Sequence, residues 1–275
     1  MIIDSHQHFW NYNQEEFNWI NNEMKSIKRS FLPKDLKATL SDTGVEGVVS
    51  VQARQSLEET EWLLQLASDN EFIKGVVGWV PLSDKNIPEI LSRLNNNNLL
   101  KGVRHVIQDE PDSRFILKKT FNNGISHLKN YGLVYDILIF SHQLPNTIRF
   151  VDQHPGQPFV LDHIAKPEIR FNEIRVWEKS IKELALRENV SCKLSGMVTE
   201  AGFTNWTENQ LKPYFDVVLE AFGPGRLLFG SDWPVCLVAT SYKSWLKLVK
   251  KWISKLSNFE QEQILSRNAI MIYNL

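Results

Sequence analysis

The chain opens with the stretch Ile2-Ile3-Asp4-Ser5-His6-Gln7-His8. If this stretch is extended, the alternation of side chains places Asp4, His6 and His8 on one face. The two imidazoles then converge at the end of a first strand, where they can bind a metal ion or a substrate oxygen. We expect Asp4, which lies beneath them, to orient one imidazole. A His-x-His pair alone is more often structural, so evidence for a functional role has to come from other residues of the chain.

Short apolar runs recur along the rest of the chain, separated by longer amphipathic stretches with helical spacing. This alternation predicts an α/β fold with parallel strands. The eight expected strands are Ile2–His6, Gly47–Gln52, Lys74–Val80, Lys101–Val106, Leu133–Phe140, Pro158–His163, Val190–Leu194 and Arg226–Ser231. Eight strands in 275 residues indicate a (β/α)8 TIM barrel, in a single domain over residues 1–275.

Helices are expected between the strands. Their predicted ranges are Pro33–Thr43, Ser56–Asp69, Ile87–Leu94, Arg114–Asn130, Asn146–Gln153, Asn172–Glu188, Thr207–Phe222, Ser241–Trp252 and Asn258–Met271. Ser56, followed three residues later by Glu59, predicts a capping box. The two longest gaps between strands contain Phe9–Phe31 and Thr199–Trp206. Because each gap follows a strand, we expect both segments on the catalytic face of the barrel.

The composition favours a small-molecule partner. Lys and Arg number 31 against 32 Asp and Glu, so the net charge of −1 gives no general attraction to nucleic acid or to an anionic membrane. The only cysteines are Cys192 and Cys236, the first residues show no basic segment followed by an apolar stretch, and no apolar run reaches membrane-spanning length. We therefore expect reduced thiols and a cytoplasmic protein. A homo-oligomer is left open.

Two further predicted strands end in ionisable side chains, at the edge where barrel enzymes place catalytic groups. One ends with Val160-Leu161-Asp162-His163, and the other with Phe229-Gly230-Ser231-Asp232. Alternation turns His163 toward the pocket and Asp162 away from it, into the layer between barrel and helices. We expect Asp232 to share the pocket with His163.

Seven sequence motifs occur in order along the chain. They are Asp4-Ser5-His6-Gln7-His8-Phe9-Trp10, Gln52-Ala53-Arg54-Gln55-Ser56-Leu57-Glu58-Glu59-Thr60, Gly75-Val76-Val77-Gly78-Trp79, Gly102-Val103-Arg104-His105, Leu161-Asp162-His163-Ile164-Ala165-Lys166-Pro167, Cys192-Lys193-Leu194-Ser195-Gly196 and Phe229-Gly230-Ser231-Asp232-Trp233-Pro234. Together they resemble the sugar lactonases of the amidohydrolase superfamily. The resemblance implies hydrolysis of an L-fucono-lactone or L-rhamnono-lactone in L-fucose or L-rhamnose catabolism. By matching motif, it implies that His6, His8, His163 and Asp232 are catalytic.

The chemistry of lactone hydrolysis gives each of these residues a role. The reaction needs an activated water, a stabilised oxyanion and a proton for the departing ring oxygen. Asp232 is the expected base, which accepts a proton from water and returns it to the leaving alkoxide. The imidazoles of His6, His8 and His163 polarise the carbonyl, directly or through a bound divalent ion.

The sequence leaves the need for a metal ion open. His6, His8, His163 and Asp232 can hold one Zn²⁺ with a free position for water, but the resemblance also covers enzymes that work without metal. Binuclear amidohydrolases bridge their ions with a carboxylated lysine at the mouth of the fourth strand. Lys101 lies at the opposite end of that strand, so we do not expect a binuclear site.

Other polar and aromatic side chains follow strands on the expected catalytic face. Arg104 can bind a carboxylate or sugar hydroxyls, and alternation allows only one of Arg104 and His105 to point inward. Further candidates for substrate binding are Gln52, Arg54, Trp10, Trp79, His142, Lys166 and Trp233. The polar residues among them can equally stabilise loops, and the tryptophans can equally pack in the core. For Lys193 we expect a salt bridge.

Two other functions are compatible with the same residues. Related barrels use such histidines for amide hydrolysis, deamination or decarboxylation of an aromatic acid. Decarboxylation favours an apolar slot for the ring, whereas a sugar lactone needs several polar groups. A non-catalytic binding barrel is the second alternative. The presence of all four residues His6, His8, His163 and Asp232 argues against it.

Overall fold

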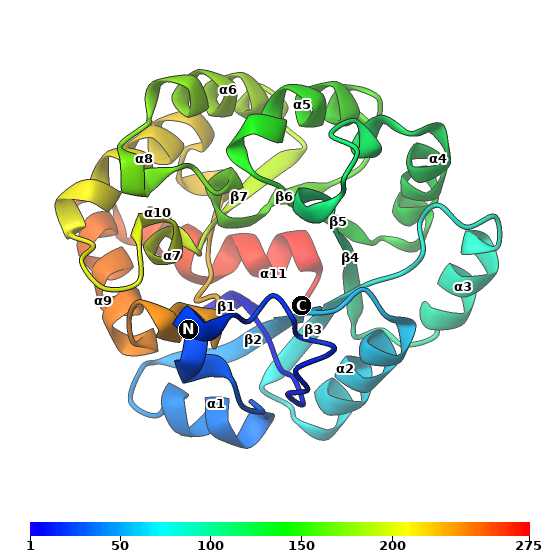
Figure 1. The fold of residues 1–275 in the computed structure, drawn as a ribbon, viewed down its shortest axis with the longest axis horizontal. Helices are drawn as coiled ribbons and strands as arrows, with labels where there is room; N and C mark the ends of the chain where they lie inside the picture. Colours follow the sequence, from blue (N-terminus) through cyan, green and yellow to red (C-terminus); the bar gives the residue numbers. More distant parts are fainter.

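The computed structural model describes residues 1–275, and eight parallel strands run around its centre (Figure 1). The strands are β1 (Ile2–Gln7), β2 (Val45–Val51), β3 (Ile73–Gly78), β4 (Leu100–Val106), β5 (Val134–Leu138), β6 (Phe159–Leu161), β7 (Val190–Leu194) and β8 (Leu227–Phe229). Each strand pairs with the next in chain order. The segment after β8 returns to β1, where the His8 N–H donates to the Trp233 carbonyl at 2.7 Å. The barrel is nearly closed, and the predicted (β/α)8 fold is confirmed.

Helices surround the barrel and connect its strands (Figure 1). They are α1 (Pro33–Leu40), α2 (Leu57–Asp69), α3 (Ile87–Leu94), α4 (Lys119–Leu128), α5 (Leu144–Asp152), α6 (Arg175–Ala185), α7 (Met197–Ala201), α8 (Glu208–Phe222), α9 (Tyr242–Ile253), α10 (Asn258–Glu262) and α11 (Asn268–Tyr273). The predicted final helix is divided, because a π-helical turn at Gln263–Arg267 separates α10 from α11. The short helix α7 was not predicted. No helix combines the length and apolar character that a membrane span requires.

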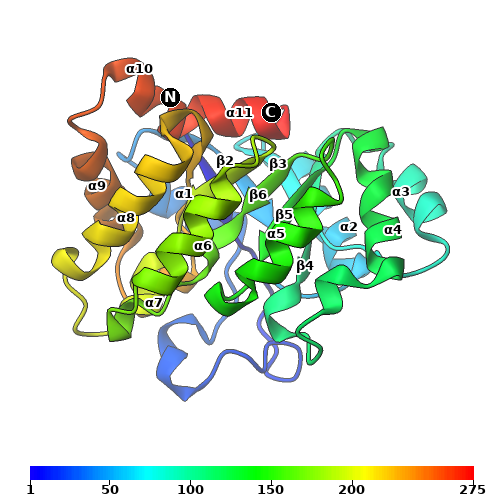
Figure 2. The same cartoon turned by 90° about the horizontal axis from the view of Figure 1, so that it is seen from above.

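The two ends of the barrel are covered differently. In Figure 2, α11 (red) lies at one end, and the segment between β1 and α1 (blue) lies at the other. Ala269 and Tyr273 of α11 belong to the same buried cluster as Leu228 inside the barrel, so this helix closes the amino-terminal end of the strands. The predicted insertion Phe9–Phe31 extends over the carboxyl end, where Trp19 lines a cavity. The carboxyl end is therefore the mouth.

The strands are buried on both faces, which explains their runs of β-branched residues. A compact cluster fills the inside of the barrel and includes Val49, Val51 and Val134. A much larger cluster fills the space between the strands and the helices. Not all inner side chains are apolar, because Lys193 and Asp136 form a buried ion pair inside the barrel.

β1 departs from simple alternation. Its register with β2 shifts between Asp4 and Gln7, where β1 carries one residue more than its partner. Because of this bulge, Ile3 and His6 both point into the barrel, although they are three residues apart. Asp4 points outward instead and accepts a hydrogen bond from the Tyr242 hydroxyl of α9 at 3.0 Å. The prediction that Asp4 orients an imidazole is wrong.

β6 also differs from the predicted parity. Val160 packs inside the barrel, so Asp162 points inward as well and lies 3.0 Å from the ammonium of Lys193. The prediction that Asp162 faces the helical layer is therefore wrong. His163 reaches the mouth because the chain leaves the strand in a left-handed turn. Its φ is +52°, and φ stays positive through Lys166.

The predicted cap of α2 is present, but its acidic partner acts elsewhere. The Ser56 hydroxyl accepts a hydrogen bond from the Glu59 N–H at 3.1 Å, as an N-cap should. The Glu59 carboxylate does not return to the cap. It accepts from the N–H groups of Ala53 at 2.9 Å and Arg54 at 2.7 Å, and burial raises its pKa to about 7. Glu59 thus holds the loop that follows β2.

Candidate active site

A cavity of about 160 Å³ opens at the mouth of the barrel. It is lined by His8, Trp19, Ala53, Arg104, Val106, Gln108, Asp109, Leu138, His163, Lys166, Asp232 and Val235. These residues come from segments at the ends of several different strands, which is where barrel enzymes build their sites. Three of the predicted catalytic side chains, those of His8, His163 and Asp232, line it directly.

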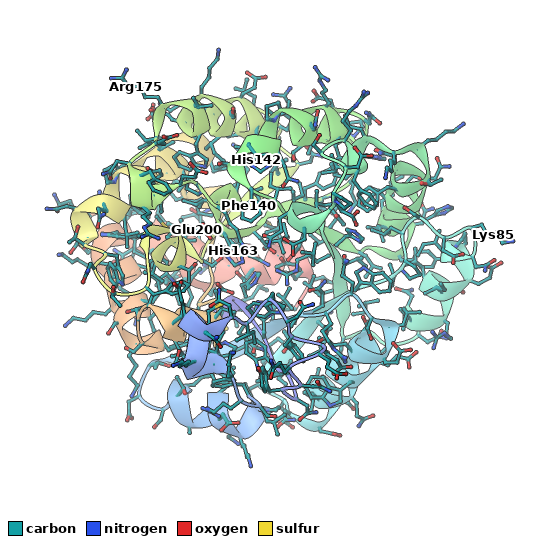
Figure 3. The ribbon with its side chains drawn as sticks, in the orientation of Figure 1. Lys85, Phe140, His142, His163, Arg175 and Glu200 are labelled. Atoms are coloured by element: carbon teal, nitrogen blue, oxygen red, sulfur yellow. The ribbon has the colours of Figure 1, made fainter.

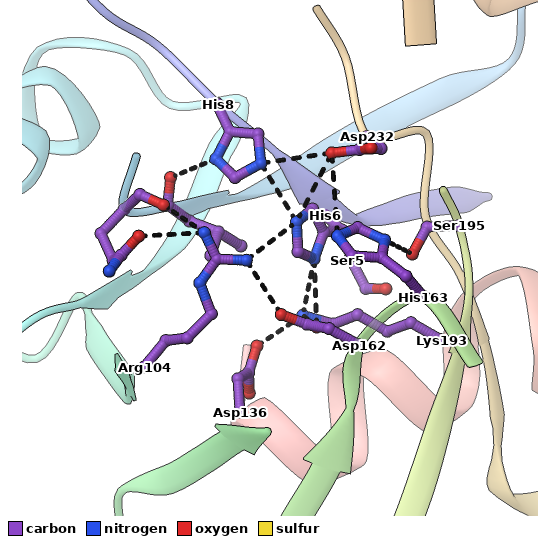
Figure 4. Close-up of polar contacts among 12 residues, drawn as sticks. Ser5, His6, His8, Arg104, Asp136, Asp162, His163, Lys193, Ser195 and Asp232 are labelled. Carbon is purple, nitrogen blue, oxygen red and sulfur yellow. Dashed lines mark hydrogen bonds and ion pairs between the residues drawn. The ribbon is translucent and has the colours of Figure 1, made fainter. Parts of the chain in front are cut away.

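The predicted catalytic residues converge around the carboxylate of Asp232 (Figure 4). Its Oδ1 lies 3.3 Å from His8 Nε2, 3.8 Å from His6 Nε2 and 3.9 Å from His163 Nε2. The Nε2 atoms of His6 and His8 are 3.1 Å apart. Three imidazole nitrogens therefore face one carboxylate, and all four side chains are at least 94% buried.

Hydrogen bonds to Nδ1 fix two of the imidazole rings. His8 Nδ1 lies 2.8 Å from the carbonyl oxygen of Val51, which can only accept, so Nδ1 carries the proton of the neutral ring. The Nε2 lone pair of His8 then points toward Asp232. His163 Nδ1 lies 2.8 Å from the hydroxyl of Ser195, just after β7. Each ring therefore presents Nε2 to the cavity.

The charge states of these groups follow from their burial and proximity. Burial lowers the pKa of His163 to about 4 and holds the pKa of His6 well below its ordinary value, so both rings are neutral near pH 7. Burial opposes the ionisation of Asp232. The surrounding histidines, above all His163, nevertheless hold the pKa of Asp232 below its usual range. The site at neutral pH therefore contains one carboxylate that faces the neutral rings of His6 and His163.

A charged layer lies beneath the histidines, inside the barrel. The Lys193 ammonium contacts the carboxylates of Asp136 and Asp162 and approaches His6 Nδ1 to 3.2 Å (Figure 4). Asp162 Oδ1 is also 3.2 Å from that nitrogen. Burial alone would raise the pKa of Asp162, but Lys193 and His6 help to hold it well below its ordinary value. From α11, the Tyr273 hydroxyl donates to Asp136 at 2.8 Å. The expected salt bridge of Lys193 is thus part of a network that supports His6.

Arg104 joins this network to the cavity. One terminal nitrogen of its guanidinium donates to Asp162 at 3.0 Å, and the other donates to the side-chain oxygen of Gln52 at 2.9 Å. Gln52 is fully buried and does not line the cavity, so it holds the guanidinium in place. His105 points away from the mouth, toward Glu110 at 2.7 Å. Only one of the two residues points inward, as alternation requires, and the structure shows that it is Arg104.

The tryptophans divide between packing and the cavity. Trp10 and Trp233 are almost fully buried and do not line the cavity, which agrees with the core-packing interpretation. Trp79 donates its indole N–H to His105 at 3.2 Å and also lies outside the cavity. Trp19 lines the cavity and belongs to the predicted insertion Phe9–Phe31, although it was not among the candidate residues. Its ring meets that of Trp10 edge-on at 5.9 Å, so the buried tryptophan supports the exposed one.

The remaining sequence candidates lie in three different places. Arg54 forms ion pairs with Glu16 and Glu59 and is not a cavity residue. His142 is exposed and lines a second cavity next to the first. Lys166 lines both cavities. Of these three residues, only Lys166 lines the catalytic cavity.

Sequence reasoning missed several residues of the site. Gln108 and Asp109 lie in a 3-10 turn after β4, for which no motif gave a signal. Asp136 did have a signal, because it is a charged residue within an otherwise apolar barrel strand, as is Lys193, whose salt bridge was expected. Two opposite charges inside neighbouring parts of a barrel predict an ion pair.

The donor atoms at the mouth fit a divalent metal ion. His6 Nε2, His8 Nε2 and Asp232 Oδ1 lie 3.1 to 3.8 Å from one another. Ligands around one tetrahedral zinc ion are about 3.4 Å apart, given metal–ligand distances of about 2.0–2.1 Å. His8 offers a free lone pair, and Asp232 offers a negative charge. A lysine that bridges two metal ions would have to lie at the mouth. Lys101 lies away from the mouth, where its ammonium donates to the Asn274 carbonyl at 2.7 Å, near the C-terminal end of the chain.

Comparison with known proteins identifies the family of this chain. Residues 3–275 match the family model described as amidohydrolase, so the chain belongs to the amidohydrolase family. The family predicted from the motifs is confirmed. The chain is 38% identical to L-fucono-1,5-lactonase of Burkholderia multivorans, over 99% of this chain and 96% of that protein.

Two further relatives place the chain within this family. A crystal structure of an amidohydrolase from Burkholderia multivorans with bound zinc matches it with a TM-score of 0.97 and 37% identity, covering 100% of this chain and 99% of that one. L-rhamnono-gamma-lactonase of Scheffersomyces stipitis is 26% identical, over 71% of this chain and 67% of that protein. Both lactonases that were expected from the sequence are thus found among its relatives.

Proposed function

We propose that this protein is a lactonase that hydrolyses a sugar-acid lactone to the free aldonic acid. The observation that carries the proposal is the convergence of His6, His8, His163 and Asp232 at the barrel mouth. Similarity to L-fucono-1,5-lactonase along nearly the whole chain supports L-fucono-1,5-lactone as the first candidate substrate. The product carries one carboxylate and one new hydroxyl.

The lining of the cavity supports a polyhydroxylated substrate. Arg104, Gln108, Asp109 and Lys166 present charged or polar groups to it, beside the catalytic side chains. An aromatic acid that undergoes decarboxylation needs an apolar slot for its ring. The polar lining therefore favours lactone hydrolysis over decarboxylation.

Asp232 is the base in the proposed mechanism. Because it is ionised near neutral pH, it can accept a proton from the water that attacks the lactone carbonyl carbon. The resulting tetrahedral intermediate expels the ring oxygen, and protonated Asp232 returns the proton to that alkoxide. One water is consumed, and the C–O bond of the ring is broken.

Arg104 and the imidazole of His163, with its proton on Nε2, stabilise the negative charge that develops on the carbonyl oxygen, whereas His8 Nε2 carries a lone pair and cannot donate to it. The guanidinium is held by Asp162 and Gln52, so it pays little reorganisation energy when charge develops. His163 is anchored by Ser195 and faces Asp232 across the cavity. These fixed positions match the requirement for groups arranged before the reaction begins.

We further propose that His6, His8 and Asp232 hold one divalent metal ion, for which Zn²⁺ is the first candidate. Zinc bound to a similar structure supports this choice. When bound, such an ion supplies Lewis-acid polarisation of the carbonyl and a more acidic water. The charged layer beneath His6 keeps that ring in place for this task.

A direct assay tests the proposed function. L-fucono-1,5-lactone and L-rhamnono-γ-lactone are incubated with the folded protein, and ring opening is followed against the spontaneous rate. We expect hydrolysis of at least one of them well above that rate. A folded protein that opens no member of a panel of aldonolactones would falsify the proposal. An aromatic carboxylic acid in the same panel tests for decarboxylation.

Metal removal is expected to lower the activity. Chelation followed by dialysis should reduce kcat/KM by roughly 100-fold or more, because Lewis-acid stabilisation is lost. Elemental analysis should find about one equivalent of metal before chelation, and added Zn²⁺ should restore both metal content and activity. Full activity of a protein shown to contain no metal would contradict the metal hypothesis. Direct polarisation of the lactone carbonyl by protein side chains would then be the mechanism.

Gly196 is expected to control the position of His163. It has a φ of +65°, and a Cβ there would lie 2.6 Å from His163 Nδ1. Gly132 is a matched control, because its φ is +66° and a Cβ there meets nothing within 4 Å. Both Gly→Ala variants should lose about 1–2 kcal/mol of stability from the left-handed backbone. Only Gly196→Ala should also lose kcat/KM, by about 10- to 100-fold. Equal activities of the two variants would contradict this role.

A further inference from the structure

A second cavity, of about 460 Å³, adjoins the catalytic one. Its lining comprises Phe140, Ser141, His142, Lys166, Glu168, Arg170, Phe171, Thr199 and Glu200, and Lys166 also lines the catalytic cavity. Figure 3 shows Phe140, His142 and Glu200 near His163, in the central part of the view into the barrel. A ligand held by Asp232 and the histidines therefore has room to extend past Lys166 into the second cavity.

Glu200 is the carboxylate that this second cavity adds to the site. It lies on α7, which begins after Gly196, where the backbone packs against His163. Burial raises the pKa of Glu200. The charge of Lys166 lowers it in part, and the charge of Asp232 raises it further. No hydrogen bond or ion pair within the chain satisfies the Glu200 carboxylate. Glu200 is partly buried and its side chain lines the second cavity, so a ligand bound there can replace the solvent at its carboxylate.

Lys166 is the matching unpaired cation. It ends the left-handed segment after β6, and its ammonium lies 5.6 Å from the centre of the Phe140 ring, without an ion pair to any carboxylate. Lys166 and Glu200 thus line one cavity with opposite charges and are not joined to each other. A ligand that lies between them can satisfy both.

The hydrogen-bonding capacity of the two groups defines that ligand. An ammonium can only donate, and an ionised carboxylate can only accept. A hydroxyl does both, so neighbouring hydroxyls on one ring can accept from Lys166 and donate to Glu200. Phe140 and Phe171 add aromatic surface to the same cavity, against which the less polar face of a sugar ring can pack.

We propose that Glu200, together with Lys166, binds ring hydroxyls of the lactone and determines the preference for polyhydroxylated over unsubstituted lactones. This inference rests on the proposed lactonase function and deepens it. Glu200 is a specificity residue, because it contacts hydroxyls that do not take part in bond cleavage. Its contacts are equally strong in the bound substrate and in the transition state, so KM rather than kcat should report them.

Two substrates with the same six-membered ring test the inference. L-fucono-1,5-lactone carries ring hydroxyls, and δ-valerolactone carries none. Glu200→Ala should raise KM for L-fucono-1,5-lactone by about 10- to 100-fold, the loss expected for charged hydrogen bonds, and leave its kcat/KM for δ-valerolactone within about twofold. Glu200→Gln should fall between the wild type and Glu200→Ala. Glu71→Gln, an exposed carboxylate before β3, is the control and should match the wild type.

The outcomes separate this inference from the proposed function. Equal losses with both lactones, or no loss with either, would overturn the assignment of Glu200. If the wild type opened neither lactone and no other member of the aldonolactone panel, the proposed lactonase function itself would fail. Calorimetric titration with L-fuconate, the acid product, then tests the subsite alone: equal affinity of wild type and Glu200→Ala overturns it, and a 10-fold or greater loss supports it. Thermal melting of Glu200→Ala should be unchanged or slightly improved.

Discussion

Asp232→Asn should lower kcat/KM for L-fucono-1,5-lactone by about 100- to 10,000-fold, which is the range that a positioned general base contributes. Asparagine keeps the size of the side chain, but it cannot accept a proton from water near neutral pH. The loss should appear in kcat, because proton transfer occurs only as the transition state forms. Initial rates at saturating substrate, corrected for spontaneous opening, are the measurement.

The control for this variant is Asp69→Asn, at the exposed end of α2, which should behave as wild type. Circular dichroism should show an unchanged fold for both proteins, because Asp232 contributes no backbone contact through its carboxylate. If Asp232→Asn kept more than half of the wild-type kcat, Asp232 would not be the base. If the wild type and Asp232→Asn both opened the lactone no faster than the spontaneous rate, a barrel without catalytic function would be the better interpretation.

Lys193→Met should destabilise the fold more than any surface substitution. It leaves the buried carboxylates of Asp136 and Asp162 without the ammonium between them. Removal of one partner from a buried ion pair costs about 3–5 kcal/mol, which lowers Tm by roughly 10 °C or more in a chain of this size. Denaturant titration followed by fluorescence measures the free energy of unfolding. Lys179→Met, at an exposed position of α6, should change it little.

A second substitution makes the cause of this loss testable. In Lys193→Met/Asp136→Asn, one of the two stranded charges is also removed, so the double variant should be more stable than Lys193→Met alone. If the loss in free energy of unfolding of the double variant equalled the sum of the losses of the two single variants, the charges would not interact.

Acid should also rescue Lys193→Met in part. Burial raises the pKa of Asp136 to about 6 even beside Lys193, and loss of the ammonium raises it further. Because the folded state then binds a proton more tightly than the unfolded state, stability is gained as the pH falls through that raised pKa. A stability of Lys193→Met that did not rise between pH 8 and pH 5 would contradict this explanation.

The barrel and the side chains that gather at its mouth could be predicted from the sequence because both depend on local patterns. Apolar runs such as Val190–Leu194 identify buried parallel strands, and polar residues at strand ends, such as His163 and Asp232, identify the mouth. Alternation within β4 predicted that only one of Arg104 and His105 points inward, and the structure shows that it is Arg104.

The errors arose where the backbone leaves regular geometry. A bulge in β1 turned Asp4 outward, and a left-handed turn after β6 let both Asp162 and His163 face the site. A two-residue period contains no information about either irregularity. Trp19 and Glu200 were missed for a different reason, because they lie on segments after β1 and β7 whose path depends on packing between distant parts of the chain.

The contact between Tyr273 and Asp136 has a consequence for biosynthesis. The support for His6 runs from Lys193 through Asp136 to the hydroxyl of Tyr273, so the last helix takes part in holding a residue of the first strand. A nascent chain cannot complete this support until Tyr273 has left the ribosome. Catalytic competence should therefore appear only after translation of α11, however early the preceding βα units condense.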